Sequence, residues 1–219
     1  MKFLYLAAGK NNFHLDSKED VPKCLTNYNN KETILDKILS NLEEVGIQNT
    51  YVVGGYKILS IIEKYPLLKY FYNGNWENTK SLTTLFSARS EFNDDLIISY
   101  SDVVYQPKLL NDLLVSNFDI TIGYDSKWKN RYSGRGADFL DEAEKIIKNS
   151  DCSVRLDKQT TNEENVLGEF IGVFQIKRSI SNVLNKEIAK VLKNNPTASV
   201  CDLINQLQKK HSIGFVDVE

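Results

Sequence analysis

The chain has 219 residues, of which 42% are hydrophobic and 26% are charged. This composition is typical of a soluble globular protein, and the length is compatible with a single domain over residues 1–219. No apolar run approaches the ~20 residues of a membrane-spanning helix. The formal net charge of -2 gives no basic footprint, which argues against nucleic acid as the main partner.

The amino-terminal sequence MKFLYLAAGK is apolar only over a short, strand-like run. It is therefore not predicted to be a signal peptide, and we expect a cytoplasmic protein. The cysteines Cys24, Cys152 and Cys201 are far apart and form no CxxC pair. They predict neither a disulfide framework nor a zinc site, so reduced thiols are expected.

Strands and helices are predicted to alternate in the first half of the chain. Strands are predicted at apolar runs rich in β-branched and aromatic residues, at 2–8, 50–56, 69–74, 95–105 and 119–125. Helices are predicted where apolar residues recur every three or four positions, at 32–46, 58–66, 83–92 and 107–116. This alternation favours a three-layer α/β domain around a mainly parallel sheet.

The pattern changes after residue 126. Residues 127–167 are mostly polar, contain the sequence SGRG and lead into a strand-like run at 168–176. Two further helices and a last strand are predicted at 180–195, 199–211 and 213–218. We interpret residues 127–177 as an insertion that lies over the sheet, not as a second domain.

The sequence LAAGKNN, residues 6–12, follows the first predicted strand. In open α/β sheets, ligands bind beyond the carboxyl ends of the strands, where a glycine turn lets backbone N–H groups approach a phosphate. The loop matches neither GxGxxG nor the Walker A motif, so taken alone it is equally compatible with an ordinary turn. The missing GxGxxG also disfavours NAD as a ligand.

Two other residues favour phosphate binding. Lys23, held by Pro22, could reach back to the charge that develops on a phosphoryl group, the alternative being a plain surface lysine. Asp102 follows a buried strand at a place where Mg²⁺ could be held, the alternative being a turn cap.

Together, LAAG, PKCL and YSDVVY resemble the nucleotidyltransferases that share the sugar-nucleotidyltransferase fold. The segments ENTKSLTTLFSAR, DEAEKI and GEFIGVFQI are similar to those of the cytidylyltransferases that activate phosphocholine or small phosphonates. The resemblance runs from residue 3 to about residue 218. It implies a Rossmann-like three-layer α/β/α sandwich with a mixed, mainly parallel sheet and an inserted segment that covers the substrate.

The resemblance also implies the reaction, which is transfer of CMP from CTP to a small phosphate or phosphonate acceptor with release of pyrophosphate and with Mg²⁺ as cofactor. Lys23 and Asp102 are the expected catalytic residues, and Asp102 and Asp217 the expected metal ligands. The expected nucleotide-binding residues are Leu6, Ala7, Ala8, Gly9, Lys10, Lys23, Thr79, Lys80 and Ser101.

The acceptor is expected to meet the insertion. An acidic and aromatic pocket for an ammonium group, based on charge pairing and cation–π contact, is predicted from Trp128, Tyr132, Glu142, Glu144 and Glu169. The alternatives are a solvated helix face for DEAEKIIK and simple loop packing for Trp128.

Some positions depart from the family pattern. The family loop continues as GxGxR, whereas KNNF stands here at residues 10–13, so that Lys10 or Lys18 would have to supply the charge of the missing arginine. Lys80 stands where the family has asparagine. The chain ends before a strand that carries a second metal-binding aspartate in relatives. Three alternatives are open for the metal site. Asp217 completes it, phosphates and water complete it around Asp102, or the chain is shortened.

Two alternative functions remain open at this point. One is a hexose-1-phosphate nucleotidyltransferase, which the TTLFSAR and GEFIG stretches do not support. The other is a nucleotide-binding protein that has lost catalysis. His14 and His211 are expected to be non-catalytic, because a phosphate or phosphonate acceptor needs no strong general base.

Overall fold

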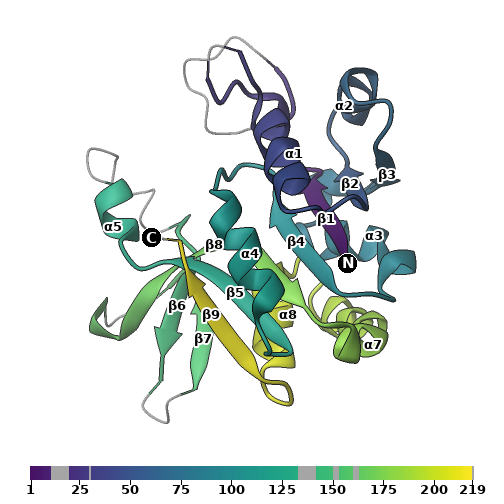
Figure 1. Cartoon of the computed structure of the whole chain (residues 1–219). Helices are drawn as coiled ribbons and strands as arrows, with labels where there is room; N and C mark the ends of the chain where they lie inside the picture. The colour runs from purple at the N-terminus through teal and green to yellow at the C-terminus, as the bar shows by residue number, and fades with distance from the viewer. Residues whose placement is uncertain (11–19, 30, 133–141, 150–152, 160–162, 219) are drawn as a thin grey trace.

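The computed structural model describes residues 1–10, 20–29, 31–132, 142–149, 153–159 and 163–218 (Figure 1). The SGRG sequence, Asn11, Asn12, Phe13, His14, Lys18 and Cys152 lie outside these residues. The strands are β1 (Lys2–Ala7), β2 (Thr50–Gly54), β3 (Lys69–Tyr72), β4 (Leu96–Tyr100), β5 (Ile120–Asp125), β6 (Lys145–Lys148), β7 (Val154–Asp157), β8 (Val166–Ile176) and β9 (Ile213–Asp217). The helices are α1 (Ile34–Glu44), α2 (Ile58–Lys64), α3 (Ser81–Ser87), α4 (Pro107–Val115), α5 (Trp128–Arg131), α7 (Arg178–Asn194) and α8 (Val200–Leu207).

The strands form one sheet in the order β3-β2-β1-β4-β8-β5-β9. Along this path β8 pairs antiparallel with β4 and β5, and the other pairs are parallel. All strands of the path except β8 therefore run in the same direction in the part of the chain that the structure describes. Their carboxyl ends meet at one edge of the sheet, where ligands bind in open α/β folds.

Helices cover both faces of the sheet. Successive strand residues point to opposite faces, so that Phe3 and Tyr5 enter the core under α1, α2 and α4, whereas Leu4 and Leu6 enter the core under α3, α7 and α8. The predicted three-layer α/β fold with a mainly parallel sheet is confirmed.

The expected insertion continues the sheet. Strand β6 pairs antiparallel with β8, and β7 pairs with β6. The structure corrects the alternative of a solvated helix face for DEAEKIIK, because residues 145–148 are a strand in which Ile146 and Ile147 are buried. The two isoleucines point to opposite faces, and both faces of this strand carry apolar cover.

Two helices begin with the same local device. Thr33 and Asp36 form a capping box at the start of α1, and Ser199 and Asp202 form another at the start of α8. Each box satisfies backbone N–H groups that the first helical turn leaves unpaired, and stabilises the helix by about 1 kcal/mol. The box at α8 also sets the position of a residue, Cys201, that borders the pocket described below.

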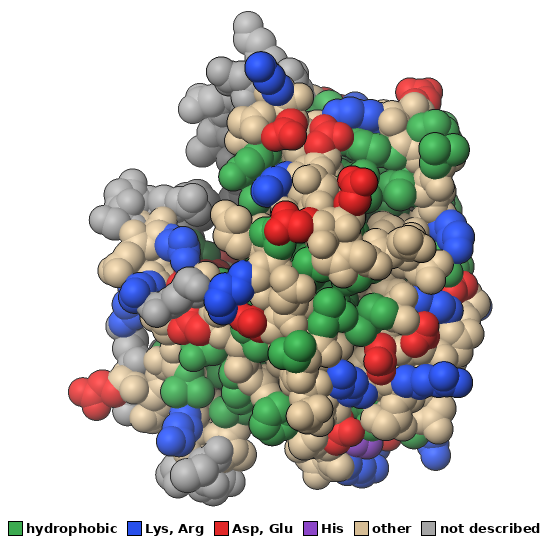
Figure 2. Space-filling model, viewed as in Figure 1, with side chains coloured by type: hydrophobic (Ala, Val, Ile, Leu, Met, Phe, Trp, Pro, Cys, Tyr) green, Lys and Arg blue, Asp and Glu red, His purple; other side chains and the backbone are tan. Residues whose placement is uncertain are grey.

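The surface agrees with the small net charge. In Figure 2, lysine, arginine, aspartate and glutamate side chains are interspersed over the visible face, with apolar side chains between them. Among the described residues, no helix has the length and apolar character to cross a bilayer.

Candidate functional site

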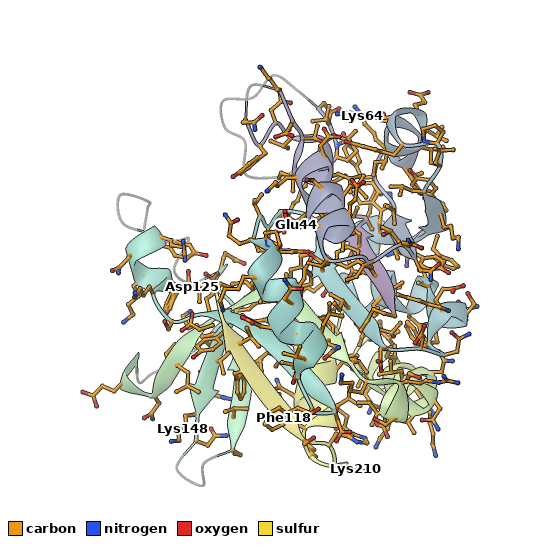
Figure 3. The ribbon with its side chains drawn as sticks, viewed as in Figure 1. Glu44, Lys64, Phe118, Asp125, Lys148 and Lys210 are labelled. Atoms are coloured by element: carbon orange, nitrogen blue, oxygen red, sulfur yellow. The ribbon has the colours of Figure 1, made fainter. Side chains whose placement is uncertain are left out.

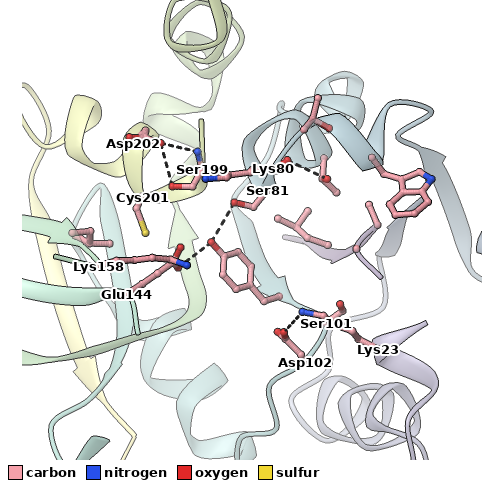
Figure 4. Close-up of a pocket in the computed structure, with 18 of the residues that line it drawn as sticks. Lys23, Lys80, Ser81, Ser101, Asp102, Glu144, Lys158, Ser199, Cys201 and Asp202 are labelled. Carbon is pink, nitrogen blue, oxygen red and sulfur yellow. Dashed lines mark hydrogen bonds and ion pairs between the residues drawn. The ribbon is translucent and has the colours of Figure 1, made fainter. Parts of the chain in front are cut away.

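A pocket of about 480 Å³ lies beyond the carboxyl ends of β1 and β4 (Figure 4). Both halves of the sheet contribute to it. Its lining residues are Leu6, Ala8, Gly9, Lys23, Trp76, Thr79, Lys80, Ser81, Thr84, Tyr100, Ser101, Asp102, Glu144, Leu156, Asp157, Lys158, Ser199, Cys201, Asp202 and Asn205. We call the wall formed by residues 6–102 the β1/β4 side and the wall formed by residues 144–205 the β6/α8 side.

The end of β1 forms the floor of the β1/β4 side. The backbone N–H of Tyr56 donates to the Ala8 carbonyl at 2.9 Å, and a Cβ atom at Gly55 would lie 2.7 Å from that carbonyl oxygen. A Cβ atom at Gly9 would meet no atom of the described residues within 4 Å. Protein packing therefore requires a glycine at position 55 but not at position 9, where the space beside the backbone is open to the pocket.

Lys23 and Asp102 form an ion pair at the mouth of the pocket. Lys23 Nζ lies 2.8 Å from Asp102 Oδ2, and the two side chains are 22% and 44% exposed. Pro22 begins a 3-10 turn whose Cys24 side chain is fully buried, and this anchors the backbone of Lys23. Tyr5 fixes the backbone just before Asp102, because its hydroxyl donates to the Ser101 carbonyl at 3.1 Å. Part-exposed pairs contribute little to stability, so both groups can exchange partners when a charged ligand enters.

The buried thiol of Cys24 agrees with a structural role. Burial raises its pKa to about 12, so the thiol stays protonated at neutral pH. Cys24 and Cys201 are both free and buried.

Thr79 and Lys80 lie at the start of α3. Asn73 is buried and donates through Nδ2 to Thr79 Oγ1 and Thr84 Oγ1, both at 3.1 Å. These bonds fix the turn that leads into α3 and place the exposed Lys80 at the pocket wall. Lys23, Lys80 and Lys158 are the cations that line the pocket in the described residues.

Glu144 forms the centre of the β6/α8 side. The Tyr100 hydroxyl donates to Glu144 Oε2 at 3.2 Å, and the Cys201 thiol also hydrogen bonds to this carboxylate. Burial raises the pKa of the Glu144 carboxyl above its ordinary value. The group is therefore a carboxyl group held in a fixed position, partly removed from water, and facing the pocket.

The other acidic and aromatic residues predicted for the acceptor lie elsewhere. Lys145 and Glu169 are partners in the β6–β8 register and share a face of the sheet, so the adjacent Glu144 points to the opposite face. Glu169 accepts a hydrogen bond from Tyr132 at 2.6 Å, and Trp128 is 4% exposed and packs edge-on against Tyr132. The structure does not place all five residues at one pocket, because Glu144 lines the pocket whereas Trp128, Tyr132 and Glu169 contact one another outside its wall.

Glu142, Asp217 and Lys10 also lie outside the pocket wall. Glu142 forms an exposed ion pair with Lys158. Asp217 ends β9, and its Oδ1 atom accepts from the Ser126 backbone at 3.4 Å. Lys10 Nζ lies 5.5 Å from the centroid of the Tyr56 ring.

Ala7 and Asp125 each end a strand of the sheet but do not line the pocket. Ala7 is buried in the core under α1, because it points to the face opposite Leu6 and Ala8. Asp125, labelled in Figure 3 at the end of β5, is 2% exposed and ion-paired with Arg131. Asp125 is thus already paired within its own loop.

The donor set fits Mg²⁺ only in part. Within the described ranges, no group of three or more His, Cys, Asp or Glu side chains could hold a metal ion. Mg²⁺, however, is commonly bound by one or two carboxylates together with substrate phosphates and water, not by an all-protein cage. Asp102 is half-exposed at the pocket mouth and meets that requirement.

No protein-family profile matches the sequence. The chain is 30% identical over 184 residues to the CTP:phosphoglutamine cytidylyltransferase of Campylobacter jejuni. The matched region covers 80% of this chain and 72% of that relative. The chain belongs to the cytidylyltransferases of the sugar-nucleotidyltransferase fold. The predicted family is confirmed by this relative.

Two solved structures share the fold of this cytidylyltransferase. The inositol-1-phosphate CTP transferase of T. maritima superposes with a TM-score of 0.73 at 15% identity, over 99% of this chain and 85% of that chain. A putative glucose-1-phosphate thymidylyltransferase of Bacillus anthracis superposes with a TM-score of 0.74 at 10% identity, over 100% of this chain and 87% of that chain. At these identities, both show the fold alone.

Sequence reasoning missed Tyr100 on the β1/β4 side and most of the β6/α8 side of this cytidylyltransferase. Tyr100 immediately precedes Ser101 and Asp102, which were predicted, and its place at the end of a buried strand was the available signal. Ser199 and Asp202 have the spacing of a capping box, which locates a helix start but not a pocket. Lys158 and Asn205 carry no sequence signal that separates them from surface residues.

Proposed function

We propose that the chain transfers CMP from CTP to a small phosphate or phosphonate acceptor and releases pyrophosphate. The observation that carries this proposal is one pocket in which the LAAG loop end and the Lys23–Asp102 pair face a half-buried carboxylate, Glu144. The β1/β4 side has the backbone and cations that phosphates need. The β6/α8 side offers a separate surface for the acceptor.

Lys23 is the proposed electrostatic catalyst. Its ammonium lies at the pocket mouth, and it would neutralise the negative charge that develops on the α-phosphate while an acceptor oxygen attacks in line. Leu6, Ala8 and Gly9 would position the nucleotide through the backbone at the end of β1. A phosphate or phosphonate dianion is itself the nucleophile, so the absence of a histidine from the described pocket wall agrees with this reaction.

Mg²⁺ is the cofactor that we propose, with Asp102 as its protein ligand beside phosphate oxygens and water. When bound, it supplies positive charge to the triphosphate and its leaving group. Asp217 remains the proposed second ligand. Substitution of Asp217 by asparagine should raise the Mg²⁺ concentration that gives half-maximal turnover, because the ion would lose a charged ligand.

The acceptor carries a phosphate or phosphonate and, at its far end, a group that Glu144 can bind. The relative from Campylobacter jejuni is named for phosphoglutamine, so this compound belongs among the acceptors to be tested. A carboxylate accepts hydrogen bonds and attracts positive charge, which favours an acceptor with an ammonium or N–H group.

The test is pyrophosphate release with Mg²⁺ and each of the four NTPs. The acceptors are phosphocholine, 2-aminoethylphosphonate, phosphoglutamine, phosphoramidates and glucose 1-phosphate. We expect CTP-dependent turnover with an amine- or amide-bearing acceptor, and its loss by at least about a hundredfold in Lys23→Ala and Asp102→Ala. The matched controls are Lys108→Ala and Asp112→Ala, which break an exposed pair in α4 with a 2.6 Å separation and should leave turnover unchanged.

Two other results would replace the proposal. Turnover with glucose 1-phosphate alone would indicate a hexose-1-phosphate nucleotidyltransferase. CTP binding without turnover of any acceptor would indicate a nucleotide-binding protein that has lost catalysis.

A further inference from the structure

The hydroxyl of Tyr100 joins the two sides of the pocket. It donates to Glu144 Oε2 at 3.2 Å and lies 3.3 Å from Ser81 Oγ. Ser81 Oγ in turn accepts from the Val200 backbone N–H at 2.9 Å. One chain of hydrogen bonds therefore connects the start of α3, the end of β4, the residue before β6 and the start of α8. Figure 4 draws the part of this chain between Ser81 and Glu144.

The Tyr100 ring is wedged in place. It packs edge-on against Phe170, with ring centroids 5.9 Å apart and planes at 67°. On β8, Gly172 has a φ of 78°, and a Cβ atom there would lie 2.3 Å from Tyr100 Cδ2. The backbone of Gly172 thus supports the ring directly, and the hydroxyl is held at Glu144 by packing that does not depend on the hydrogen bond.

We propose that Tyr100 is a positioning residue that fixes the Glu144 carboxylate toward the acceptor and so sets acceptor affinity, without a part in CTP affinity. This rests on the proposed function, because Glu144 faces an acceptor only if the β1/β4 side holds the nucleotide. Four groups act on Glu144: Tyr100 on β4, Asp102 after it, Lys158 after β7 and Cys201 on α8. Tyr100 is the group among them that donates from a hydroxyl on a ring held by Gly172 and Phe170.

The acceptor class follows from the group that is positioned. A fixed, partly desolvated carboxylate with two donors already bound has its remaining acceptor capacity directed to the ligand. It selects acceptors with an N–H or ammonium group over neutral hydroxyl compounds, since hydrogen bonds that involve a charged group are the stronger ones.

The experiment compares Tyr100→Phe with Tyr105→Phe. Both changes remove one hydroxyl and keep the ring. The Tyr105 hydroxyl donates to Ser99 Oγ at 3.3 Å, and neither residue lines the pocket. CTP affinity is measured by calorimetry without acceptor, and kcat and KM for 2-aminoethylphosphonate and phosphoglutamine by pyrophosphate release. For Tyr100→Phe we expect about a tenfold rise in acceptor KM, with the Kd for CTP unchanged within twofold. Tyr105→Phe should leave both constants unchanged.

A double-mutant cycle separates positioning from a general structural effect. If Tyr100 acts through Glu144, the rise in acceptor KM caused by Tyr100→Phe should vanish in a Glu144→Ala background. Ser81→Ala breaks the same chain at its other end and should raise the acceptor KM in the same direction. It also provides the test if Tyr100→Phe does not fold.

Three results would overturn the inference. They are an unchanged acceptor KM in Tyr100→Phe, an equal loss of CTP affinity, or additive effects of the two substitutions in the cycle. In each of these cases the wild-type enzyme still turns over an acceptor, so the proposed function stands. If the wild type turns over no acceptor, both proposals fail together.

Discussion

The two walls of the pocket are built in different ways. On the β1/β4 side, the residues that contact the pocket follow directly from strand ends and short motifs, as with Gly9 after β1 and Asp102 after β4. On the β6/α8 side, Glu144, Lys158 and Cys201 come from separate elements that only the pairing and packing of the fold bring together. Tyr100 and Ser81 connect the walls. The first wall is thus a local property of the chain, and the second is a property of the fold.

The largest expected effect tests whether the β6/α8 side depends on the fold. Gly172→Ala should lower the free energy of unfolding by about 2–5 kcal/mol, because it places a side chain at positive φ and against the Tyr100 ring. Gly46→Ala is the control, since Gly46 has a nearly equal φ of 76° but open space around its Cβ position. Urea unfolding of both variants separates backbone strain from the contact with Tyr100. Equal losses would show that the ring contact contributes nothing.

On the β1/β4 side, Gly9→Ala should change CTP affinity and leave stability nearly unchanged. The Cβ atom meets no atom within 4 Å in the part of the chain that the structure describes, so the free energy of unfolding should change by less than about 1 kcal/mol. The same atom occupies space that a nucleotide would need, so the Kd for CTP should rise about tenfold. Calorimetry and urea unfolding on the same samples check both statements. A stable variant with unchanged CTP affinity would remove the loop end from the nucleotide site.

Strand β8 carries a buried polar residue, Gln175, that belongs to neither wall of the pocket. Gln175 on β8 is fully buried, and its Oε1 and Nε2 atoms have no hydrogen-bond partner among the described residues. Gln175→Met keeps the volume and removes the unpaired amide, so it should raise the free energy of unfolding by about 1–2 kcal/mol. Turnover should not change, because Gln175 does not line the pocket. Gln48→Met, at an exposed position, is the control and should have no effect on stability.

The sequence allowed prediction of the first wall better than of the second for a physical reason. The strands, the helices and the meeting of Lys23 with Asp102 follow from periodicity and from the rule that strand carboxyl ends share an edge. Whether Glu144 or Glu169 faces the pocket depends on the register of β6 against β8, which a one-residue shift would invert. Composition and spacing do not determine that register, so Trp128 and Glu169 were grouped with Glu144 although they pack elsewhere.

The smallest effect concerns the charge of the second wall. Burial raises the pKa of Glu144, while Cys201, Lys158 and Tyr100 lower it and Asp102 raises it further, with a net pKa above the ordinary value. A carboxyl whose pKa is higher in the folded than in the unfolded state binds its proton more tightly when folded. Stabilisation by this group is therefore complete below the unfolded pKa of about 4.3 and is lost as the pH rises through the folded pKa.

Glu144→Gln removes this titration. Relative to the variant, the wild type should lose free energy of unfolding as the pH rises from about 4.3 through the folded pKa of Glu144, with no difference in slope at higher pH. Urea unfolding of the two proteins over a pH series measures the difference directly. Parallel curves across the series would mean that Glu144 titrates like an exposed carboxyl. The wall would then be hydrated, and its selectivity for N–H-bearing acceptors would have to come from shape alone.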